Sequence, residues 1–258
     1  MACEAEMPGR MLTLEQLQMV YYRYYTSGKF VQGKQVLEIG CGAGIGLGYL
    51  AKRAKKVIGT DYSEDNLRYA QQHYKGKIEL LLQDAHNLVF KDNSFDVIVA
   101  MEVIFYLRHV GKFLDECHRV LKKEGTLIIC LPNKDVPGFR RSKLSYRYYS
   151  VPELSALLDQ YRFDAELFGA FPVAKGSRAT WRTQVTVLGG INEILDRMPK
   201  GGEAKKFINK FILHKTALKG EIEDEDMKIL ENIRMVPLPR DSPDFRHKIL
   251  YAIAHVRS

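Results

Sequence analysis

A glycine-dense segment, Val36-Leu-Glu-Ile-Gly-Cys-Gly-Ala-Gly-Ile-Gly46, limits the fold of this 258-residue chain more than any other feature. Its first residues have the β-branched and apolar character of a buried strand, and residues 47–53 continue as a short helix. Glycines in the turn between them let the backbone approach a ligand closely, and the amides that open a helix attract anionic groups. The segment therefore predicts a strand, a ligand-binding turn and a helix.

The turn does not have the spacing of a dinucleotide-binding loop, whose glycines follow the pattern GxGxxG. When Gly40 and Gly42 take the first two positions, the third is Ile45. When Gly42 and Gly44 take them, the third is Leu47. Both side chains are too large for that position, so the turn does not predict a nicotinamide cofactor.

Short apolar runs alternate with helix-length segments from residue 35 to residue 131. The strands are expected at QVLEI, KVIGT, KIELLL, FDVIVAM and TLIICL. Helices are expected at 47–53, after the N-cap Ser63, at 110–123 and, further on, at 151–161. This alternation predicts an α/β fold with a doubly wound sheet covered by helices on both faces. Ligands of such folds bind beyond the carboxyl ends of the strands.

The composition is that of an ordinary globular protein. The chain is 46% hydrophobic and 27% charged, and its 39 basic and 31 acidic residues leave a formal charge of +8. No apolar stretch approaches the ~20 residues that a membrane-spanning helix requires, and the first residues lack the pattern of a signal peptide, so we expect a cytoplasmic protein. Cys3, Cys41, Cys117 and Cys130 show no CxxC spacing, which predicts buried, reduced thiols.

Five features, in order, carry a resemblance to a known family. Residues 38–44 have the form E-x-G-x-G-x-G, Asp61 closes KVIGTD, and Asp84 follows the third strand. FDVIVAMEVIFYL at 95–107 and LKKEGTLIICLPNK at 121–134 complete the series. The chain thus resembles the class I S-adenosylmethionine-dependent methyltransferases, in their type 11, small-molecule branch. The resemblance covers about residues 30–135.

This resemblance implies one Rossmann-like domain with a seven-stranded, mostly parallel sheet and a helical insertion before the last strand. Residues 1–30 would form an N-terminal covering helix, and residues 31–171 would form the cofactor-binding core. Residues 172–247 would be the insertion, which acts as a substrate lid, and residues 248–258 the last strand. Within the insertion, helical periodicity occurs at 185–198 and 204–218, and the acidic run at 221–226 predicts a solvated helix start rather than a metal site.

The resemblance implies S-adenosyl-L-methionine as the cofactor, S-adenosyl-L-homocysteine as the product, and no metal. Carried over by position, Gly40, Cys41 and Gly42 would pass beneath the methionine and ribose, while Glu38 would support the turn. Asp61 would accept hydrogen bonds from the ribose hydroxyls, because a carboxylate presents two acceptor oxygens to a diol.

The adenine site would come from the ends of the next strands. Tyr62 would pack against the ring, Asp84 would accept from the adenine amino group, and the Ala85 amide would bond the ring. Met101 would line the floor through its backbone. In the family, the N-terminal helix often reaches the methionine carboxylate, and of the five residues YYRYY we favour Tyr21 and Tyr25, which share a helix face.

The acceptor site departs from the family pattern. Many relatives have histidine where this chain has Tyr106, and a phenol with an ordinary pKa near 10 is a poor base at neutral pH. Tyr106 would therefore orient the acceptor, and His109 is the alternative candidate for a base. The loop at 133–149 combines cations with aromatic rings, which suits an anionic or glycan-like acceptor. The residues expected at the acceptor, besides Tyr106, are Arg140, Arg141, Tyr146, Tyr149 and Trp181.

Three functions are weighed. The first is methyl transfer to an oxygen or nitrogen of a small molecule, such as an anionic compound, a glycan or a natural product. The second is RNA methylation, which the positive charge motivates, although nucleic-acid binding is disfavoured because the base-amine motif (N/D)PPY is absent. The third is an inactive cofactor-binding scaffold, motivated by the missing histidine. Residues 131–258 hold 22 of the basic and 16 of the acidic residues, so the charge lies mainly in the acceptor half.

Overall fold

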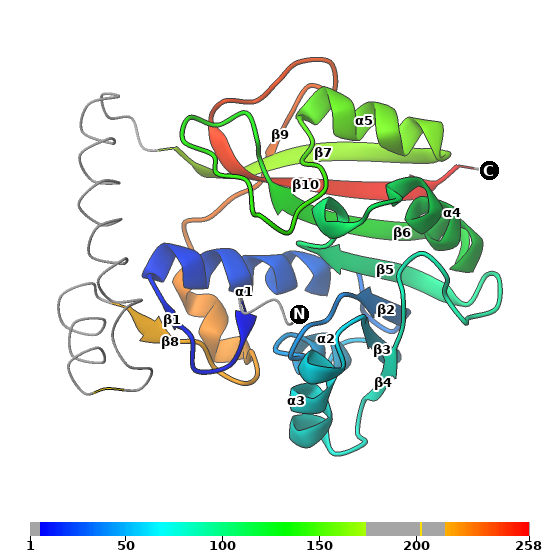
Figure 1. Ribbon diagram of the computed structural model, residues 1–258, viewed down its shortest axis with the longest axis vertical. Helices are drawn as coiled ribbons and strands as arrows, with labels where there is room; N and C mark the ends of the chain where they lie inside the picture. The colour runs from blue at the N-terminus through cyan, green and yellow to red at the C-terminus, as the bar shows by residue number, and fades with distance from the viewer. Residues whose placement is uncertain (1–5, 174–201, 203–214, 258) are drawn as a thin grey trace.

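An eight-stranded sheet forms the centre of the computed structural model, which describes residues 6–173, 202 and 215–257 (Figure 1). The strands lie in the order β4-β3-β2-β5-β6-β10-β7-β9. Their bounds are β2 Gln35–Ile39, β3 Lys56–Asp61, β4 Glu79–Leu82, β5 Phe95–Met101, β6 Leu121–Pro132, β7 Phe163–Pro172, β9 Val236–Pro237 and β10 His247–Val256. The helices are α1 Leu14–Gly28, α2 Leu47–Ala51, α3 Glu64–Tyr74, α4 Val110–Val120 and α5 Val151–Gln160, with the 3-10 helices η2 Ile104–Tyr106 and η4 Asp224–Leu230.

The sheet confirms the predicted fold class. Strands β2 to β6 pair in parallel, whereas β10 runs antiparallel between β6 and β7. Strand β7 ends at Pro172, one residue past the expected end of the cofactor-binding core, and β10 occupies 247–256, where the last strand was expected at 248–258. The eighth strand, β9, adds two residues at the edge beside β7. The arrangement is therefore doubly wound, and its ligand edge is the one at which the parallel strands end.

Alternating strand residues build one core on each face of the sheet. Val97 and Val99 of β5 face a cluster completed by α1, α2 and α3, while Ile98 and Ala100 face a second cluster completed by α4 and α5. All four side chains are fully buried. Since successive residues of a strand point to opposite faces, a strand covered on both sides must be apolar throughout. FDVIVAM satisfies this requirement.

The covering helix α1 begins with a capping box. The Thr13 hydroxyl accepts from the Gln16 amide, and the Gln16 side chain accepts from the Thr13 amide, so both free donors are satisfied. Ahead of this helix, β1 Met11–Leu12 pairs antiparallel with β8 Thr216–Ala217. The segment after β8 then reaches the motif turn, where the Ile222 amide donates to the Ile45 carbonyl over 2.8 Å. Residues 9–12 and 216–222 are therefore fixed to each other and to the motif turn.

Two helix predictions require correction. The helix expected at 110–123 ends at Val120, because Leu121 already pairs with Phe95 in the sheet and the following lysines belong to β6. The helix expected at 204–218 is wrong at its end, since residues 216–217 form β8. The remainder of that segment, apart from Lys215, and the helix expected at 185–198 lie outside the described residues.

The acidic run at 221–226 leads into η4, as a helix start should. Glu223 caps η4 through the Asp226 amide and side chain. Cys41, Cys117 and Cys130 are free and buried, while Cys3 lies outside the described residues. Within the described part of the chain, no helix is both long and apolar enough to cross a membrane.

Asn133 fastens the end of β6 to the start of β10. Its fully buried Nδ2 donates to the Asp244 carbonyl over 2.7 Å and to the His247 carbonyl over 2.9 Å, and its Oδ1 accepts from the Asp135 amide over 3.0 Å. The loop that follows β6 therefore leaves the sheet from a fixed point.

We expect Asn133→Ala to lower the free energy of unfolding by about 2–4 kcal/mol, because buried carbonyls lose their donor. Urea unfolding followed by circular dichroism measures the change. Asn87→Ala, in an exposed loop, serves as the control and should stay within about 0.5 kcal/mol of the parent. Equal effects of the two substitutions would show that Asn133 does not hold this junction.

Candidate functional site

The motif turn joins β2 to α2 through three left-handed glycines. The φ angles of Gly40, Gly42 and Gly44 are 72°, 56° and 77°, a region that favours glycine. The Gly40 and Cys41 amides donate to the Thr60 carbonyl over 2.7 and 2.9 Å, which fixes the turn against β3. A side chain at Gly40 would lie 2.4 Å from Val103, whereas one at Gly42 would meet nothing within 4 Å. The turn is thus packed against Val103 at Gly40, and it is open at Gly42.

Asp61 lies directly beside this turn. Its Oδ2 accepts from the Gly42 amide over 2.8 Å, and its Oδ1 accepts from the Ser63 amide over 2.8 Å and from the Asn66 side chain over 3.3 Å. The side chain is half-buried. Because β2 and β3 are neighbours that end at the same edge, the two predicted features come together. A half-exposed carboxylate at the rim of an open glycine turn can accept further hydrogen bonds from a ligand.

Glu38 lies beneath the turn and is almost fully buried. Its Oε1 accepts from the Tyr24 hydroxyl of α1 over 2.8 Å, while its Oε2 has no hydrogen-bond partner among the described residues. Burial raises the pKa of this carboxyl to about 8, although the Tyr24 hydrogen bond lowers it. A buried acceptor without a donor costs free energy of folding, so a ligand that brings a hydrogen-bond donor or a cation to this atom would be stabilised.

A buried guanidinium lies on the same helix. Arg23 is 7% exposed and bridges Glu6 and Glu102, the latter at 3.3 Å, but its Nε has no partner in the described structure. Glu102 follows β5 with a left-handed φ of 60°. Burial raises the pKa of Glu102 to about 7, against the opposing effect of Arg23. Two carboxylates thus share one cation, and the sequence had not indicated Arg23, Tyr24, Glu102 or Glu6 as site residues.

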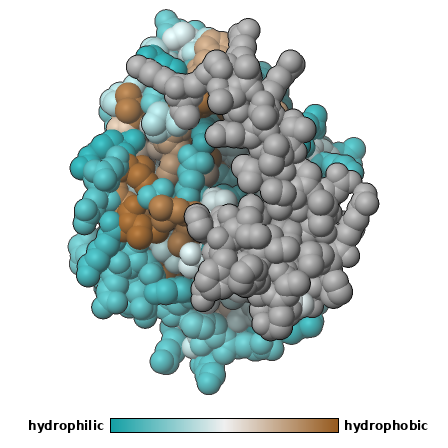
Figure 2. Space-filling model, turned by 90° about the vertical axis from the view of Figure 1, so that its left-hand side faces the viewer, coloured by the Kyte–Doolittle hydropathy of each residue, from teal (hydrophilic) through white to brown (hydrophobic). Residues whose placement is uncertain are grey.

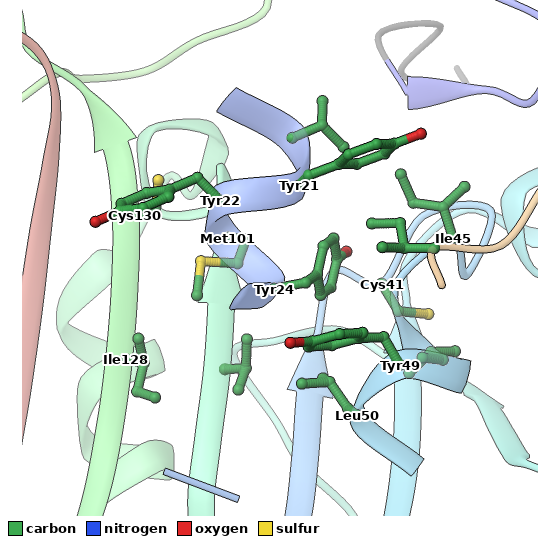
Figure 3. Packing of buried hydrophobic residues seen from close by; sticks show 14 of the residues in the cluster. Tyr21, Tyr22, Tyr24, Cys41, Ile45, Tyr49, Leu50, Met101, Ile128 and Cys130 are labelled. Carbon is green, nitrogen blue, oxygen red and sulfur yellow. The ribbon is translucent and has the colours of Figure 1, made fainter. Parts of the chain in front are cut away.

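Figure 3 shows how the tyrosines of α1 are arranged. Tyr24 points toward Cys41 and the motif turn, and its ring takes the space that a side chain at Gly46 would need. Of the two tyrosines favoured from the sequence, Tyr21 is buried among core residues beside Ile45. Tyr25 carries the Lys29 ammonium 4.4 Å from its ring centre. The helix tyrosine that bonds the motif turn is therefore Tyr24.

The predicted adenine residues lie at the ends of β3 and β4. Tyr62 is 81% exposed, Ala85 is buried, and Asp84 is exposed. The Asp84 Oδ1 is held by the His86 amide at 2.9 Å and by the His86 Nδ1 at 2.5 Å, and this partner lowers the pKa of Asp84, partly offset by desolvation. The His86 Nε2 in turn lies 3.4 Å from the amide of His109, the candidate base. The Asp84 carboxylate is thus oriented toward His86, which links it to α4.

The acceptor loop is built on η2. The Tyr146 amide donates to the Phe105 carbonyl over 2.8 Å, and Phe105 stacks on Tyr148 with ring centres 4.6 Å apart and lies 4.4 Å from the half-buried Tyr106 ring. Arg141 donates to the Ser145 and Tyr146 carbonyls over 2.6 and 2.5 Å. This cation therefore holds the loop together.

The other predicted acceptor residues are spread over this loop and beyond it. Arg140 is exposed, Tyr146 is 55% exposed, and Tyr149 is only 2% exposed, in the core. Met101 is buried at the end of β5. Trp181 lies outside the described residues. Among the residues described, no group of three or more His, Cys, Asp and Glu side chains could hold a metal ion.

Comparison with known proteins agrees with this geometry. Residues 37–129 match the family model described as a methyltransferase domain. A "Probable S-adenosylmethionine-dependent methyltransferase" of Mycolicibacterium smegmatis is 34% identical over 139 residues, which are 52% of this chain and 53% of that protein. A "Fatty-acid O-methyltransferase" of the same organism is 33% identical over 117 residues, 43% of either chain. The chain spans about half the length of these curated relatives.

Among solved structures, the YcgJ protein of Bacillus subtilis has a TM-score of 0.58 at 16% identity, covering 92% of this chain and 99% of that one. At this identity the likeness shows the fold. Residues 37–129 thus match a methyltransferase domain, and the chain is similar to S-adenosylmethionine-dependent methyltransferases, the resemblance that the five motifs indicate.

The raised carboxyl pKa values predict a pH dependence of stability. The folded chain keeps protons on Glu38 and Glu102 to a higher pH than the unfolded chain does, since their pKa values rise from 4.5 to about 8 and about 7. Unfolding therefore releases protons, and these groups make the free energy of unfolding fall as pH rises from about 5 to about 8. Glu38→Gln retains an acceptor for Tyr24 without charge and should reduce the slope.

Urea unfolding at pH 5.5, 7.0 and 8.5 measures this slope for the parent and the variant. Glu64→Gln, an exposed residue at the start of α3, is the matched control and should keep the slope of the parent. An unchanged slope in Glu38→Gln would mean that Glu38 is already ionised in the folded protein.

Proposed function

We propose that this protein is an S-adenosylmethionine-dependent methyltransferase that transfers a methyl group to an oxygen or nitrogen of a small-molecule acceptor. The observation that carries the proposal is the pairing of the open glycine turn with Asp61, within the residues that match the methyltransferase domain. The cofactor would supply an electrophilic methyl group on a sulfonium, which the acceptor displaces in line. Positioning is then the main task of the protein.

The described residues fit such a cofactor. Its amino-acid end carries an ammonium and a carboxylate, and the site offers the unpartnered Oε2 of Glu38 and the unpartnered Nε of Arg23. The open face of Gly42 leaves room for backbone contact, and Asp61 can take the ribose hydroxyls. Glu38, Gly40 and Cys41 hold the turn in shape. Tyr62, whose ring is exposed, would cover the adenine, and Asp84 and Ala85, which follow the neighbouring strand β4, would bond it.

An acceptor with an apolar body fits the face beyond the strand ends. Figure 2 views the molecule from the side toward which β5 and β6 point, and apolar side chains gather there to the left of the grey residues, with hydrophilic residues on their left-hand side. One relative is named a fatty-acid O-methyltransferase. A carboxylate oxygen is already deprotonated at neutral pH, so its methylation needs no general base. That chemistry agrees with Tyr106 in place of histidine.

Isothermal titration with S-adenosylmethionine tests the proposal. We expect binding by the parent protein and at least a tenfold weaker affinity in Asp61→Asn, because the amide loses the charge and one acceptor. Asp65→Asn is the control. Asp65 is an exposed residue of α3 that pairs with Arg68, so this variant should bind S-adenosylmethionine as the parent does. Thermal melting checks that Asp61→Asn still folds, since Asp61 also fixes the turn.

The same preparation with a long-chain fatty acid as acceptor should give S-adenosylhomocysteine and a methyl ester. Absence of cofactor binding in the parent would refute the proposal. Tight cofactor binding without turnover of any of a broad set of small molecules would instead favour an inactive, cofactor-binding scaffold.

A further inference from the structure

The buried ion cluster beneath α1 is unevenly balanced. Glu6 and Glu102 share the guanidinium of Arg23, and the charge of Glu6 adds to the burial that raises the pKa of Glu38 and of Glu102. Removing Glu6 would therefore relieve repulsion at two buried carboxyls.

Glu6 comes from a segment that lies across the ligand edge of the sheet. Two ion pairs place Glu6 there: Glu6 pairs with Arg23 of α1, and Arg23 pairs with Glu102, the residue that follows β5. The segment is fastened behind Glu6, where the Gly9 amide donates to the Leu218 carbonyl over 2.8 Å and β1 pairs with β8. Glu6 itself retains 31% exposure of its side chain, whereas that of Arg23 retains 8%. The acid is thus the part of this pair that can leave toward solvent.

The guanidinium that Glu6 occupies lies near the motif turn, because its other partner, Glu102, precedes Val103, whose side chain lies against Gly40. Arg23 is one helix position from Tyr24, whose hydroxyl bonds Glu38 beneath the turn. Its Nη2 lies 3.3 Å from Glu102 at the end of β5. Arginine binds a carboxylate through two parallel N–H donors, and Arg23 keeps one buried donor, Nε, without a partner. The Nε of Arg23 can therefore donate to a carboxylate that reaches both sides of the guanidinium.

We propose that Glu6 is an internal substitute for the α-carboxylate of the cofactor, and that cofactor loading exchanges one carboxylate for the other on Arg23. The inference rests on the proposed function. The N-terminal segment then competes with the cofactor when the site is empty, and loading releases it. Because β1 is paired with β8, its release also loosens the described end of the insertion that is expected to cover the acceptor.

S-adenosylhomocysteine is the suitable probe, because it carries the α-carboxylate without the sulfonium charge. If Glu6 holds Arg23 for about nine-tenths of the time in the empty protein, Glu6→Gln tightens the dissociation constant of this probe about tenfold. Methylthioadenosine has no carboxylate, so its affinity should not change. Glu15→Gln, which removes an exposed acid paired with Lys248 at the start of α1, is the matched control and should leave both affinities as in the parent.

A second readout follows the segment itself. Trypsin can cleave after the exposed Arg10, and the intact mass of the protein detects this cleavage. In the parent, S-adenosylhomocysteine should make the cleavage faster, whereas methylthioadenosine should not change its rate. An unchanged or weaker affinity of Glu6→Gln for S-adenosylhomocysteine, an equal gain for methylthioadenosine, or cleavage that does not respond to the probe would each overturn the exchange. If neither parent nor variant binds either nucleoside, the proposed function fails as well.

Discussion

The hydrogen bond from Tyr24 to Glu38 joins the covering helix to the motif turn, and the ligand edge of the sheet depends on it. A carboxyl group placed under a glycine turn has no access to water, so the chain must supply a donor from elsewhere. Helix α1 supplies it, and the same helix brings Arg23 to Glu102 at the end of the neighbouring strand. The turn, the strand ends and the covering helix therefore assemble as one polar unit inside an apolar frame.

Much of the core fold could be predicted, because its causes are local or periodic. FDVIVAM is apolar at every position, as a strand buried on both faces must be, and Asp61 follows a strand that adjoins β2. Helix α4 was predicted too long, because its end is set by the pairing of Leu121 with Phe95 rather than by the lysines after it. Likewise β8 forms only because β1 lies beside it. The periodicity of a sequence cannot predict pairing between residues that are far apart along the chain.

The site was less predictable than the fold for a similar reason. The spacing of Tyr21 and Tyr25 shows that they share a helix face, but not which face meets the sheet, and it is Tyr24 that bonds Glu38. The cluster around Arg23 joins residues 6, 23 and 102, which no motif connects. In the acceptor half, positive charge suggested ligand contacts, yet Arg141 is used to hold backbone carbonyls within its own loop. A net charge counts such structural cations together with any that bind ligands.

Two carboxyls, those of Glu38 and Glu102, make this edge of the sheet suited to a positively charged cofactor. Glu38 and Glu102, whose pKa values burial raises to about 8 and about 7, should ionise when the sulfonium and ammonium of S-adenosylmethionine enter. Titration calorimetry at pH 7.0 in two buffers of different ionisation enthalpy counts the protons exchanged. We expect a net release of protons when S-adenosylmethionine binds, and a smaller release in Glu38→Gln. Equal binding enthalpies in the two buffers would contradict it.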